Sequence, residues 1–168
     1  AFVSFAEVDG AGSVNVSRFG DKVIGIGGFQ NIAQNAKKMI FCGTFTAGDL
    51  QMAWPDGVTE IIREGRFSKF VAELQQVSYS GTYAAELGQE VLFITERAVF
   101  QRGPDGLVLT EIAPGIDLDK DVLAWADFKF QVSAQLQQMD ALIFSPEPMG
   151  YLPDLMAKPR LNVPPRLR

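Results

Sequence analysis

Gly25-Ile26-Gly27-Gly28 is the sequence feature best suited to chemistry. It follows the strand-like run 22–24 and precedes a segment in which apolar residues recur at helical spacing. A glycine turn before a helix leaves backbone N–H groups free and lets a ligand approach closely, so it can hold an anion or a developing oxyanion. The alternative is a tight strand-to-helix turn that needs glycine only for its positive φ. The spacing alone leaves both interpretations open.

A dinucleotide-binding fingerprint is a further interpretation of this turn. Asp49 lies 22 residues beyond Gly27, near the position of a ribose-binding acid in Gly-x-Gly-x-x-Gly proteins. Counting from Gly25, however, puts Gln30 where the third glycine should allow close packing of helix on strand. The phosphate-binding pattern Gly-x-x-x-x-Gly-Lys-Ser/Thr does not occur either. These departures disfavour a dinucleotide site.

The chain contains no histidine, which limits the chemistry that it can perform. Without an imidazole, Ser-His-Asp acyl transfer, Cys-His nucleophiles and His-ligated zinc are excluded. Chemistry then rests on carboxylates, backbone amides, Lys, Arg or Tyr, and we expect no metal site. Four glutamates lie at or near the ends of strand-like runs, where a carboxylate can face a cleft or simply be solvated. These are Glu7, Glu86, Glu96 and Glu111.

Other charged or reactive positions have a simpler structural explanation. Glu96 and Arg97 lie between two apolar runs, and we expect an exposed ion pair at a hairpin. Lys37 and Lys38 end the expected helix, where cations complement its dipole; the alternative is contact with the phosphates of a nucleotide-bearing ligand. Cys42, the single cysteine, lies in an apolar run and is expected to be a buried small hydrophobe.

Length, charge and hydropathy describe one acidic domain. The 168 residues carry 15 basic and 20 acidic side chains, a net charge of −5, which disfavours a nucleic-acid partner. No apolar run approaches the roughly 20 residues that span a membrane. One cysteine allows no internal disulfide, so we expect a reducing, cytoplasmic setting. The apolar start at Ala1 has no signal-peptide pattern, and we expect it to be a strand cut in its middle.

Apolar runs and turn residues predict an α/β fold, an open mixed sheet with flanking helices and β-hairpins. Residues 39–45 are continuously apolar, which indicates a central strand covered on both faces. Helical spacing predicts helices over 30–38 and 117–125. A shorter helix is expected over 81–87, closed by Gly88. The remaining expected strands are 3–8, 14–19, 50–54, 58–62, 70–77, 91–94, 98–101, 107–110 and 128–132.

Proline content separates a tail, 145–168, from the domain over 1–144. Six of the nine prolines lie in the tail, so we expect an extended segment without regular helix or central strand. The tail is also basic, and it can wrap a partner subunit or dock lightly on its own domain. Its basic residues are Lys158, Arg160, Arg166 and Arg168.

Five stretches, taken in order, form a recognisable pattern: 15–20, 25–38, 41–48, 94–100 and 111–118. The most specific is 25–38, Gly-Ile-Gly-Gly-Phe-Gln-Asn-Ile-Ala-Gln-Asn-Ala-Lys-Lys. Together they resemble the carboxyl-terminal, beta-subunit-like part of family I coenzyme A transferases, in the branch that uses acetate, propionate and other short-chain acyl groups. The resemblance runs from about Ala6 to Tyr151.

The resemblance implies one NagB/RpiA-like half of an enzyme whose active site lies between two similar halves. Family members move CoA from an acyl-CoA to a carboxylic acid through a glutamate, which forms an acyl-glutamyl anhydride and then a glutamyl-CoA thioester. Such covalent catalysis needs no histidine, no metal and no permanently bound cofactor, because the CoA thioester is a substrate. The resemblance further implies that Gly27 and Gly28 line the acyl pocket and donate a backbone amide to the oxyanion. The implied substrate- or CoA-binding residues are Gly25, Phe29, Asn31 and Lys38.

One departure from the family is important. The family's nucleophile stands in a Glu-x-Gly motif ahead of the Asn15 stretch, whereas Glu7 is followed by Val8 and Glu64-Gly65 comes too late. The resemblance therefore implies that the nucleophilic glutamate lies outside this chain, in an N-terminal part or alpha subunit, and that this chain alone is inactive. We also expect a homo-oligomer and no membrane partner. A non-catalytic CoA- or nucleotide-binding module and a purely structural domain remain as alternatives.

Overall fold

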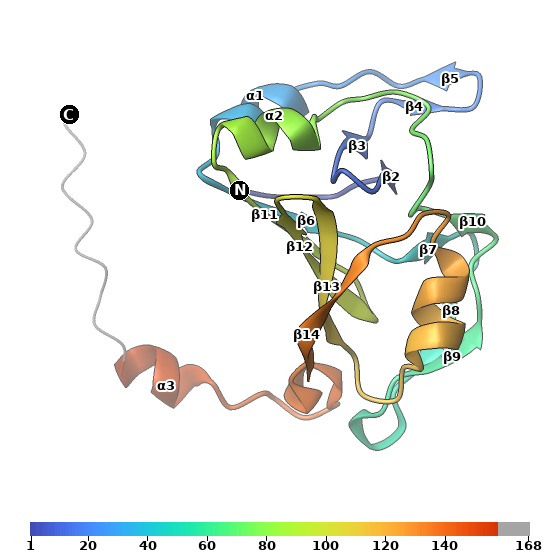
Figure 1. Cartoon of the computed structure of the whole chain (residues 1–168). Helices are drawn as coiled ribbons and strands as arrows, with labels where there is room; N and C mark the ends of the chain where they lie inside the picture. The colour runs from blue at the N-terminus through green and yellow to red at the C-terminus, as the bar shows by residue number, and fades with distance from the viewer. Residues whose placement is uncertain (158–168) are drawn as a thin grey trace.

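A central six-stranded sheet organises the chain, whose structure, a computed structural model, describes residues 1–157 (Figure 1). In spatial order its strands are β1 (Phe2–Val3), β6 (Lys38–Cys42), β11 (Glu90–Ile94), β12 (Ala98–Gly103), β13 (Gly106–Ile112) and β14 (Gln131–Gln138). β1, β6 and β11 run parallel, β11 to β13 form an antiparallel meander, and β14 returns parallel to β13. The predicted α/β class with an open mixed sheet is confirmed.

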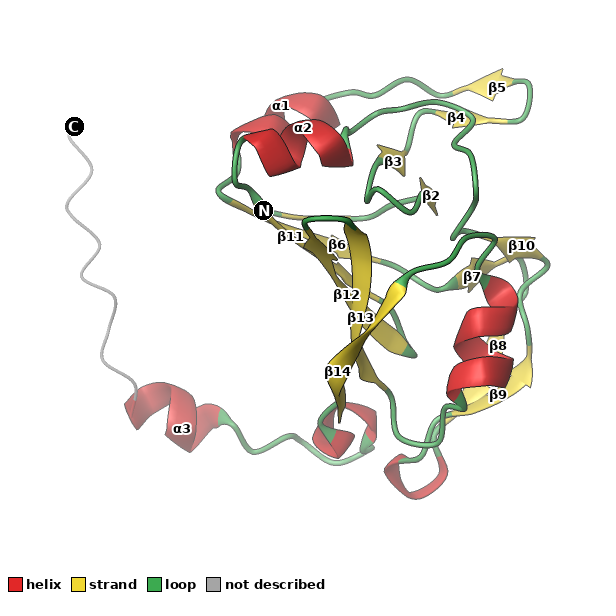
Figure 2. Cartoon of the chain, in the orientation of Figure 1, coloured by secondary structure: helices red, strands yellow, loops and turns green. Residues whose placement is uncertain are grey.

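Short helices and two-stranded sheets surround this sheet (Figure 2). The helices α1 (Phe29–Asn35) and α2 (Gly81–Glu86) are linked by Gln89, which follows α2. Its side chain donates a 2.8 Å hydrogen bond to the carbonyl of Ala33 in α1, and its backbone N–H donates a 2.9 Å hydrogen bond to the carbonyl of Ala84 in α2. The small antiparallel pairs are β2 (Glu7–Val8) with β3 (Val14–Asn15), β4 (Arg18–Phe19) with β5 (Lys22–Val23), β7 (Thr46–Ala47) with β10 (Phe67–Ser68), and β8 (Gln51–Ala53) with β9 (Glu60–Arg63). The hairpins predicted at Asp9–Gly12 and Pro55–Gly57 are confirmed.

Phenylalanine rings join the parallel strands to the loops at their carboxyl ends. Phe41 of β6 stacks on Phe93 of β11, with ring centroids 4.9 Å apart. Phe45, just beyond β6, stacks on Phe70 at 4.1 Å. Phe5 contacts both Phe93 and Phe70 edge-on, at 5.7 and 6.0 Å. These contacts bury large aromatic side chains and fix the loops that carry the polar groups described below.

The helix predicted over 30–38 is too long at its carboxyl end. It ends at Asn35, and Ala36 already has extended backbone angles of −77° and 137°. Lys38 begins β6 and pairs in register with Glu90 of β11. Lys37 and Lys38 therefore do not complement a helix dipole, because strand pairing with β11 begins at Lys38 and leaves no room for a further helical turn.

Several predicted strands are absent, split or misplaced. The strand expected over 3–8 is split into β1 and β2, and the strand expected over 14–19 is split into β3 and β4. Residues 70–77 form no strand; apart from a bridge at Phe70, the segment turns, and Gln75 binds the carboxylate of Glu7. The last strand begins at Gln131 instead of Phe128 and continues to Gln138. Phe128 packs in the core against Phe70, with ring centroids 6.3 Å apart. Packing of these aromatic rings outweighs the local strand pattern.

The helical and tail segments in the second half also need correction. The helix predicted over 117–125 forms as a π-helical turn, η2 (Leu118–Val122), and a 3-10 turn, η3 (Leu123–Trp125). The tail is not simply extended, since α3 spans Leu152–Ala157 with Pro153 in its first turn, where an N–H has no helical partner to lose. A further 3-10 turn, η4, precedes it at Ala141–Phe144. The tail residues Lys158, Arg160, Arg166 and Arg168 lie outside the described residues.

Only one face of β6 is covered, which contradicts part of the sequence analysis. Met39 and Phe41 are fully buried, whereas Ile40 is half-buried and Cys42 is exposed. Cys42 is thus not the buried hydrophobe that its apolar surroundings indicated, because no described element covers that end of the strand. Among residues 1–157, no helix combines the length and the apolar character needed to cross a membrane.

Candidate functional site

The glycine turn is open and needs glycine at two of its positions. Gly25 and Gly27 have φ values of +88° and +52°, in the left-handed region that side-chain-bearing residues rarely adopt. An added Cβ at Gly25, Gly27 or Gly28 would meet no atom within 4 Å. Gly28 is the N-cap of α1. The turn therefore satisfies both interpretations, since its conformation requires glycine and its surface admits a ligand.

The other residues that the resemblance implies lie around this turn in different ways. Phe29 is half-buried and packs on Phe41, with ring centroids 6.2 Å apart, so it anchors α1 to β6. Asn31 is exposed on α1. Lys38 stands at the start of β6 and forms an exposed ion pair with Glu90 at 2.5 Å. The structure thus groups the glycines with Phe29 and Asn31, while Lys38 is held by a partner on β11.

A second polar cluster, which the sequence analysis did not assemble, lies at the carboxyl ends of the parallel strands. Arg97, three residues beyond β11, is wholly buried. Its guanidinium donates two hydrogen bonds to Glu64, at 2.7 and 2.9 Å, one to Glu96 at 2.7 Å and one to the carbonyl of Asp121 at 3.0 Å. The expected ion pair of Glu96 and Arg97 is present, but the expectation that it is exposed is wrong, because the guanidinium is enclosed between two carboxylates.

Both carboxylates of this cluster are held by further donors. Glu96 accepts a 2.8 Å hydrogen bond from the backbone N–H of Phe45. Glu64 accepts hydrogen bonds from the Thr46 hydroxyl and from the backbone N–H of Gly65. Burial raises the pKa of Glu64, but the hydrogen bonds from Arg97 and Thr46 outweigh it and lower that pKa below its ordinary value. Glu64 is therefore ionised at neutral pH and serves as a structural acceptor.

Lys69 lies beside this cluster with a different environment. It is 8% exposed, and its ammonium lies 3.9 Å from the ring centroid of Phe5. Burial lowers the pKa of Lys69 to about 8, although the negative charge of Glu96 opposes the shift. The side chain lines a surface hollow of about 800 Å³ together with Glu7 and Arg66. Lys69 combines a buried cation with access to a cavity.

The glutamates selected from the sequence do not form one site. Glu7 and Glu96 lie near the hollow and the Arg97 cluster, respectively. Glu86 is exposed on α2, and Glu111 pairs in register with Val99 within the sheet. Glu64 and Lys69 were missed because Arg97, the main partner of Glu64, and Phe5, the aromatic partner of Lys69, are each more than thirty residues away in the sequence, and no local pattern marks them. Among residues 1–157, no group of three metal-ligating side chains is assembled.

The chain is similar in sequence to proteins named CoA-transferases. No protein-family model matches the chain. It is 48% identical over 151 residues to acetate CoA-transferase YdiF of Escherichia coli (strain K12), covering 90% of this chain and 28% of that protein. It is 45% identical over 150 residues to caffeate CoA-transferase of Acetobacterium woodii, covering 86% of this chain and 28% of that protein. The chain thus spans less than a third of the curated relatives that it matches.

A solved structure matches the fold over the same extent. The crystal structure of acyl-CoA transferase YdiF from E. coli O157:H7, in a thioester complex with CoA, superposes with a TM-score of 0.88 at 48% identity. The match covers 90% of this chain and 30% of that chain. Sequence identity and three-dimensional agreement therefore extend over the same nine-tenths of the described protein. Over that length the chain is similar, in sequence and in fold, to one part of proteins named CoA-transferases.

Proposed function

We propose that this chain is part of an enzyme that moves CoA between a short-chain acyl-CoA and a carboxylic acid. The observation that carries the proposal is the 48% identity, over 151 residues, to a protein named acetate CoA-transferase. Because the chain has no Glu-x-Gly motif ahead of Asn15 and spans only 28% of that protein, we place the nucleophilic glutamate outside the chain. The glutamate attacks the thioester carbonyl, CoA leaves as a thiolate, and the thiolate then displaces the acid to give a glutamyl-CoA thioester.

The glycine turn supplies this chain's own contribution to the proposed chemistry. Backbone N–H groups at Gly27 and Gly28 would donate hydrogen bonds to the oxyanion that forms when the thioester is attacked. The open space around Gly25, Gly27 and Gly28 supports this role, because a substrate can approach the backbone there. Phe29 would hold the turn on the sheet through its contact with Phe41.

Asn31 and Lys38 would contribute to substrate binding. Asn31 is exposed one turn beyond the N-cap of α1, where its amide can reach a ligand held at the glycine turn. Lys38 would bind CoA phosphate only by leaving Glu90. That exchange is feasible because an exposed ion pair contributes about 1 kcal/mol or less.

The proposed partners follow from the same homology. The chain would work with an acyl-CoA, a short carboxylic acid and the remaining part of the enzyme, as a homo-oligomer, without a bound cofactor, a nucleic acid or a membrane. Large exposed apolar side chains such as Phe2, Val23 and Ile24, each at least 70% exposed, support association with another protein surface. The exposed thiol of Cys42 favours a reducing compartment such as the cytoplasm.

An assay of CoA transfer by the chain alone and by the complete transferase tests the proposed function. The chain alone is compared with the complete transferase, meaning a chain of the relatives' full length that contains these 168 residues. Transfer of CoA from acetyl-CoA to propionate is followed by mass spectrometry of the acyl-CoA products. We expect transfer by the complete transferase and none by the chain alone. Transfer by the chain alone would place the nucleophile inside it, and no transfer by either protein would contradict the proposal.

The alternative of a non-catalytic CoA-binding module is supported by the open glycine turn, which admits a ligand without requiring catalysis. Hydroxylamine separates the two functions, because it cleaves acyl-glutamyl and glutamyl-CoA intermediates. The complete transferase, incubated with acetyl-CoA and hydroxylamine, should lose activity and gain a hydroxamate at one glutamate. A binding module would bind CoA but acquire no such modification.

A further inference from the structure

The Lys69 side chain is buried, and the ammonium at its end has unused hydrogen-bond donors. Lys69 is more than nine-tenths buried, and its ammonium lies over the ring of Phe5. Among residues 1–157 this ammonium makes no hydrogen bond and no ion pair, and Glu96 acts on it only by longer-range attraction. An ammonium carries three N–H donors, and at the end of a side chain that is this deeply buried it gains stability from an acceptor nearby. These donors are available to a group that is not part of the described chain.

The position of this ammonium is typical of a ligand site. Gly43 directly follows β6, and a Cβ at Gly43 would lie 2.8 Å from the Lys69 Nζ, so the ammonium occupies space that the glycine leaves. Phe5 follows β1 by two residues. Lys69 is therefore held at the carboxyl ends of parallel strands β1 and β6, the edge at which open α/β sheets bind their ligands.

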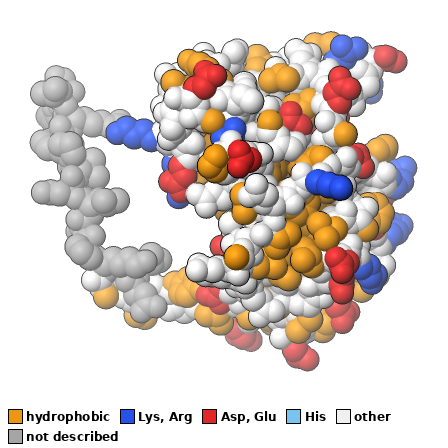
Figure 3. All heavy atoms as spheres, in the orientation of Figure 1, with side chains coloured by type: hydrophobic (Ala, Val, Ile, Leu, Met, Phe, Trp, Pro, Cys, Tyr) orange, Lys and Arg blue, Asp and Glu red, His pale blue; other side chains and the backbone are white. Residues whose placement is uncertain are grey.

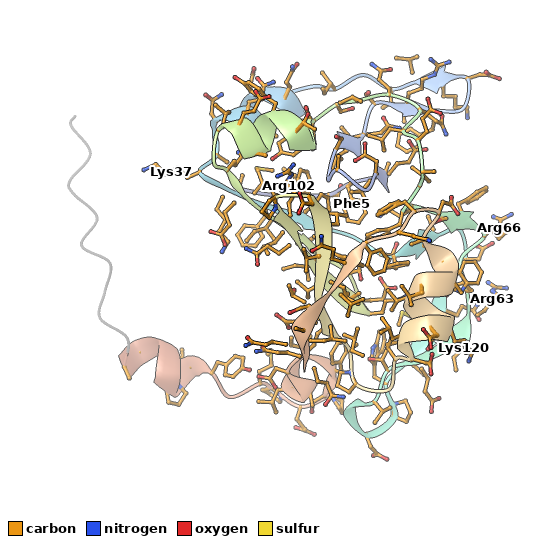
Figure 4. All side chains as sticks on the ribbon, viewed as in Figure 1. Phe5, Lys37, Arg63, Arg66, Arg102 and Lys120 are labelled. Carbon is orange, nitrogen blue, oxygen red and sulfur yellow. The ribbon has the colours of Figure 1, made fainter. Side chains whose placement is uncertain are left out.

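A hollow of about 800 Å³ opens beside Lys69, within the size range of small-molecule sites. Its wall includes the aromatic rings of Phe5, Phe19 and Phe67. Figure 4 shows Phe5 in the middle of the fold and Arg66 at the outer surface beside β10. The hollow thus offers one buried cation and an aromatic wall to the same ligand.

Charged groups at the hollow other than Lys69 are paired or solvated. Glu7 accepts hydrogen bonds from the backbone N–H and the side chain of Gln75, at 3.1 and 2.9 Å. Arg66 pairs with Asp49 at 3.1 Å. Asp127 is exposed, so solvent screens its charge. An anion that enters the hollow therefore finds its strongest available donor at Lys69.

We propose that this hollow binds an organic anion, with the anionic group on the Lys69 ammonium and an apolar body against Phe5, Phe19 and Phe67. This inference rests on the proposed function and deepens it, because the carboxylate of the acid substrate and the phosphates of CoA share this chemistry. Lys69 is protonated at pH 7, since its pKa of about 8 is higher. Affinity should therefore fall by about tenfold between pH 7 and pH 9, as the ammonium loses its proton.

Direct binding to the 168-residue chain tests the site. The probes are trans-cinnamate, butyrate and adenosine 3′,5′-bisphosphate, measured by titration calorimetry at pH 7 and pH 9. Lys69→Met removes the charge and keeps the side-chain length, and we expect at least tenfold weaker binding and no pH dependence. Lys120→Met is the matched control, because Lys120 is an exposed lysine that does not line this hollow. It should leave the affinity unchanged.

The outcomes identify the source of the anion. Binding of a carboxylate that is lost in Lys69→Met assigns the site to the acid substrate, and loss of bisphosphate binding assigns it to CoA. If no probe binds, or if Lys69→Met binds every probe as tightly as the unaltered chain, the inference is wrong. An NMR titration of the Lys69 Cε resonance needs no variant, since a bound anion should raise the pKa of Lys69. Failure of CoA transfer in the complete transferase would overturn the proposed function without changing these binding results.

Discussion

Arg97 joins three segments that are distant in the sequence. Its guanidinium bonds to Glu64 after β9, to the neighbouring Glu96 and to a carbonyl of η2. A buried guanidinium is tolerated only when carboxylates and carbonyls satisfy its donors. Glu96 also accepts a hydrogen bond from the backbone N–H of Phe45. Through Glu96, Arg97 therefore also holds the loop that follows β6. The loops at the carboxyl ends of the parallel strands are therefore held by a single charged network.

Replacing Arg97 should strongly destabilise the chain. Arg97→Met leaves Glu64 and Glu96 enclosed without their common partner, so we expect the free energy of unfolding to fall by about 3–5 kcal/mol. Urea unfolding followed by circular dichroism measures this change. Arg63→Met, at an exposed arginine on β9, should change it by no more than about 0.5 kcal/mol. Equal effects of the two substitutions would contradict the role given to Arg97.

Replacing Lys69, unlike replacing Arg97, should stabilise the chain at pH 7. Its pKa of about 8 in the folded chain is below its ordinary value of 10.5, so between these pH values the unfolded chain binds more protons. The contribution of Lys69 to the free energy of unfolding therefore rises with pH across this window, by at most about 3 kcal/mol. Lys69→Met should be more stable than the unaltered chain at pH 7 and lose this rise. Urea unfolding at pH 7.0, 8.5 and 10 checks both statements, and a destabilised variant at pH 7 would refute them.

The glycine turn acts as an element, because it sets the direction in which α1 leaves β5. Gly27 has a left-handed φ and Gly28 does not, and both have open surroundings. Gly27→Ala should therefore lower the free energy of unfolding by about 1 kcal/mol, whereas Gly28→Ala, the matched control, should leave it nearly unchanged. In the complete transferase, we expect Gly27→Ala also to reduce kcat. Thermal unfolding measures the stability and the transfer assay measures kcat, and equal losses of stability from the two substitutions would contradict the conformational explanation.

The elements differ in how well the sequence predicts them, for physical reasons. β11, β12 and β13 are short β-branched runs bounded by turn residues, and local conformational preference sets their ends. β14 was misplaced because four of its eight residues are glutamines and most of its side chains are exposed, so its few apolar residues give a weak strand pattern. The glycine turn was predictable because its signal is local. The Arg97 cluster was not, since Glu64 is 33 residues away and only the tertiary fold brings it to Arg97.

At the scale of the whole molecule, apolar surface is the outstanding property. Figure 3 shows hydrophobic side chains gathered in a patch in the lower middle of the visible face, with smaller groups elsewhere. Phe2, Leu152 and Met156 are each 69% exposed or more. A monomer of this size rarely leaves so many large apolar side chains in water. This surface agrees with a chain that spans 28% of its relatives and packs against the remaining part of the proposed enzyme.

Cys42 offers a direct test of that packing. A continuously apolar strand is typical of one covered on both faces, yet the described chain leaves Cys42 exposed at the end of β6. If the rest of the enzyme covers this face, N-ethylmaleimide should label Cys42 readily in the isolated chain and at least tenfold more slowly in the complete transferase. Mass spectrometry of the Cys42 peptide measures both rates at pH 8, and urea-unfolded protein gives the unprotected rate. Equal rates in the two folded proteins would show that the face stays open to solvent, and the apolar character of β6 would then need another explanation.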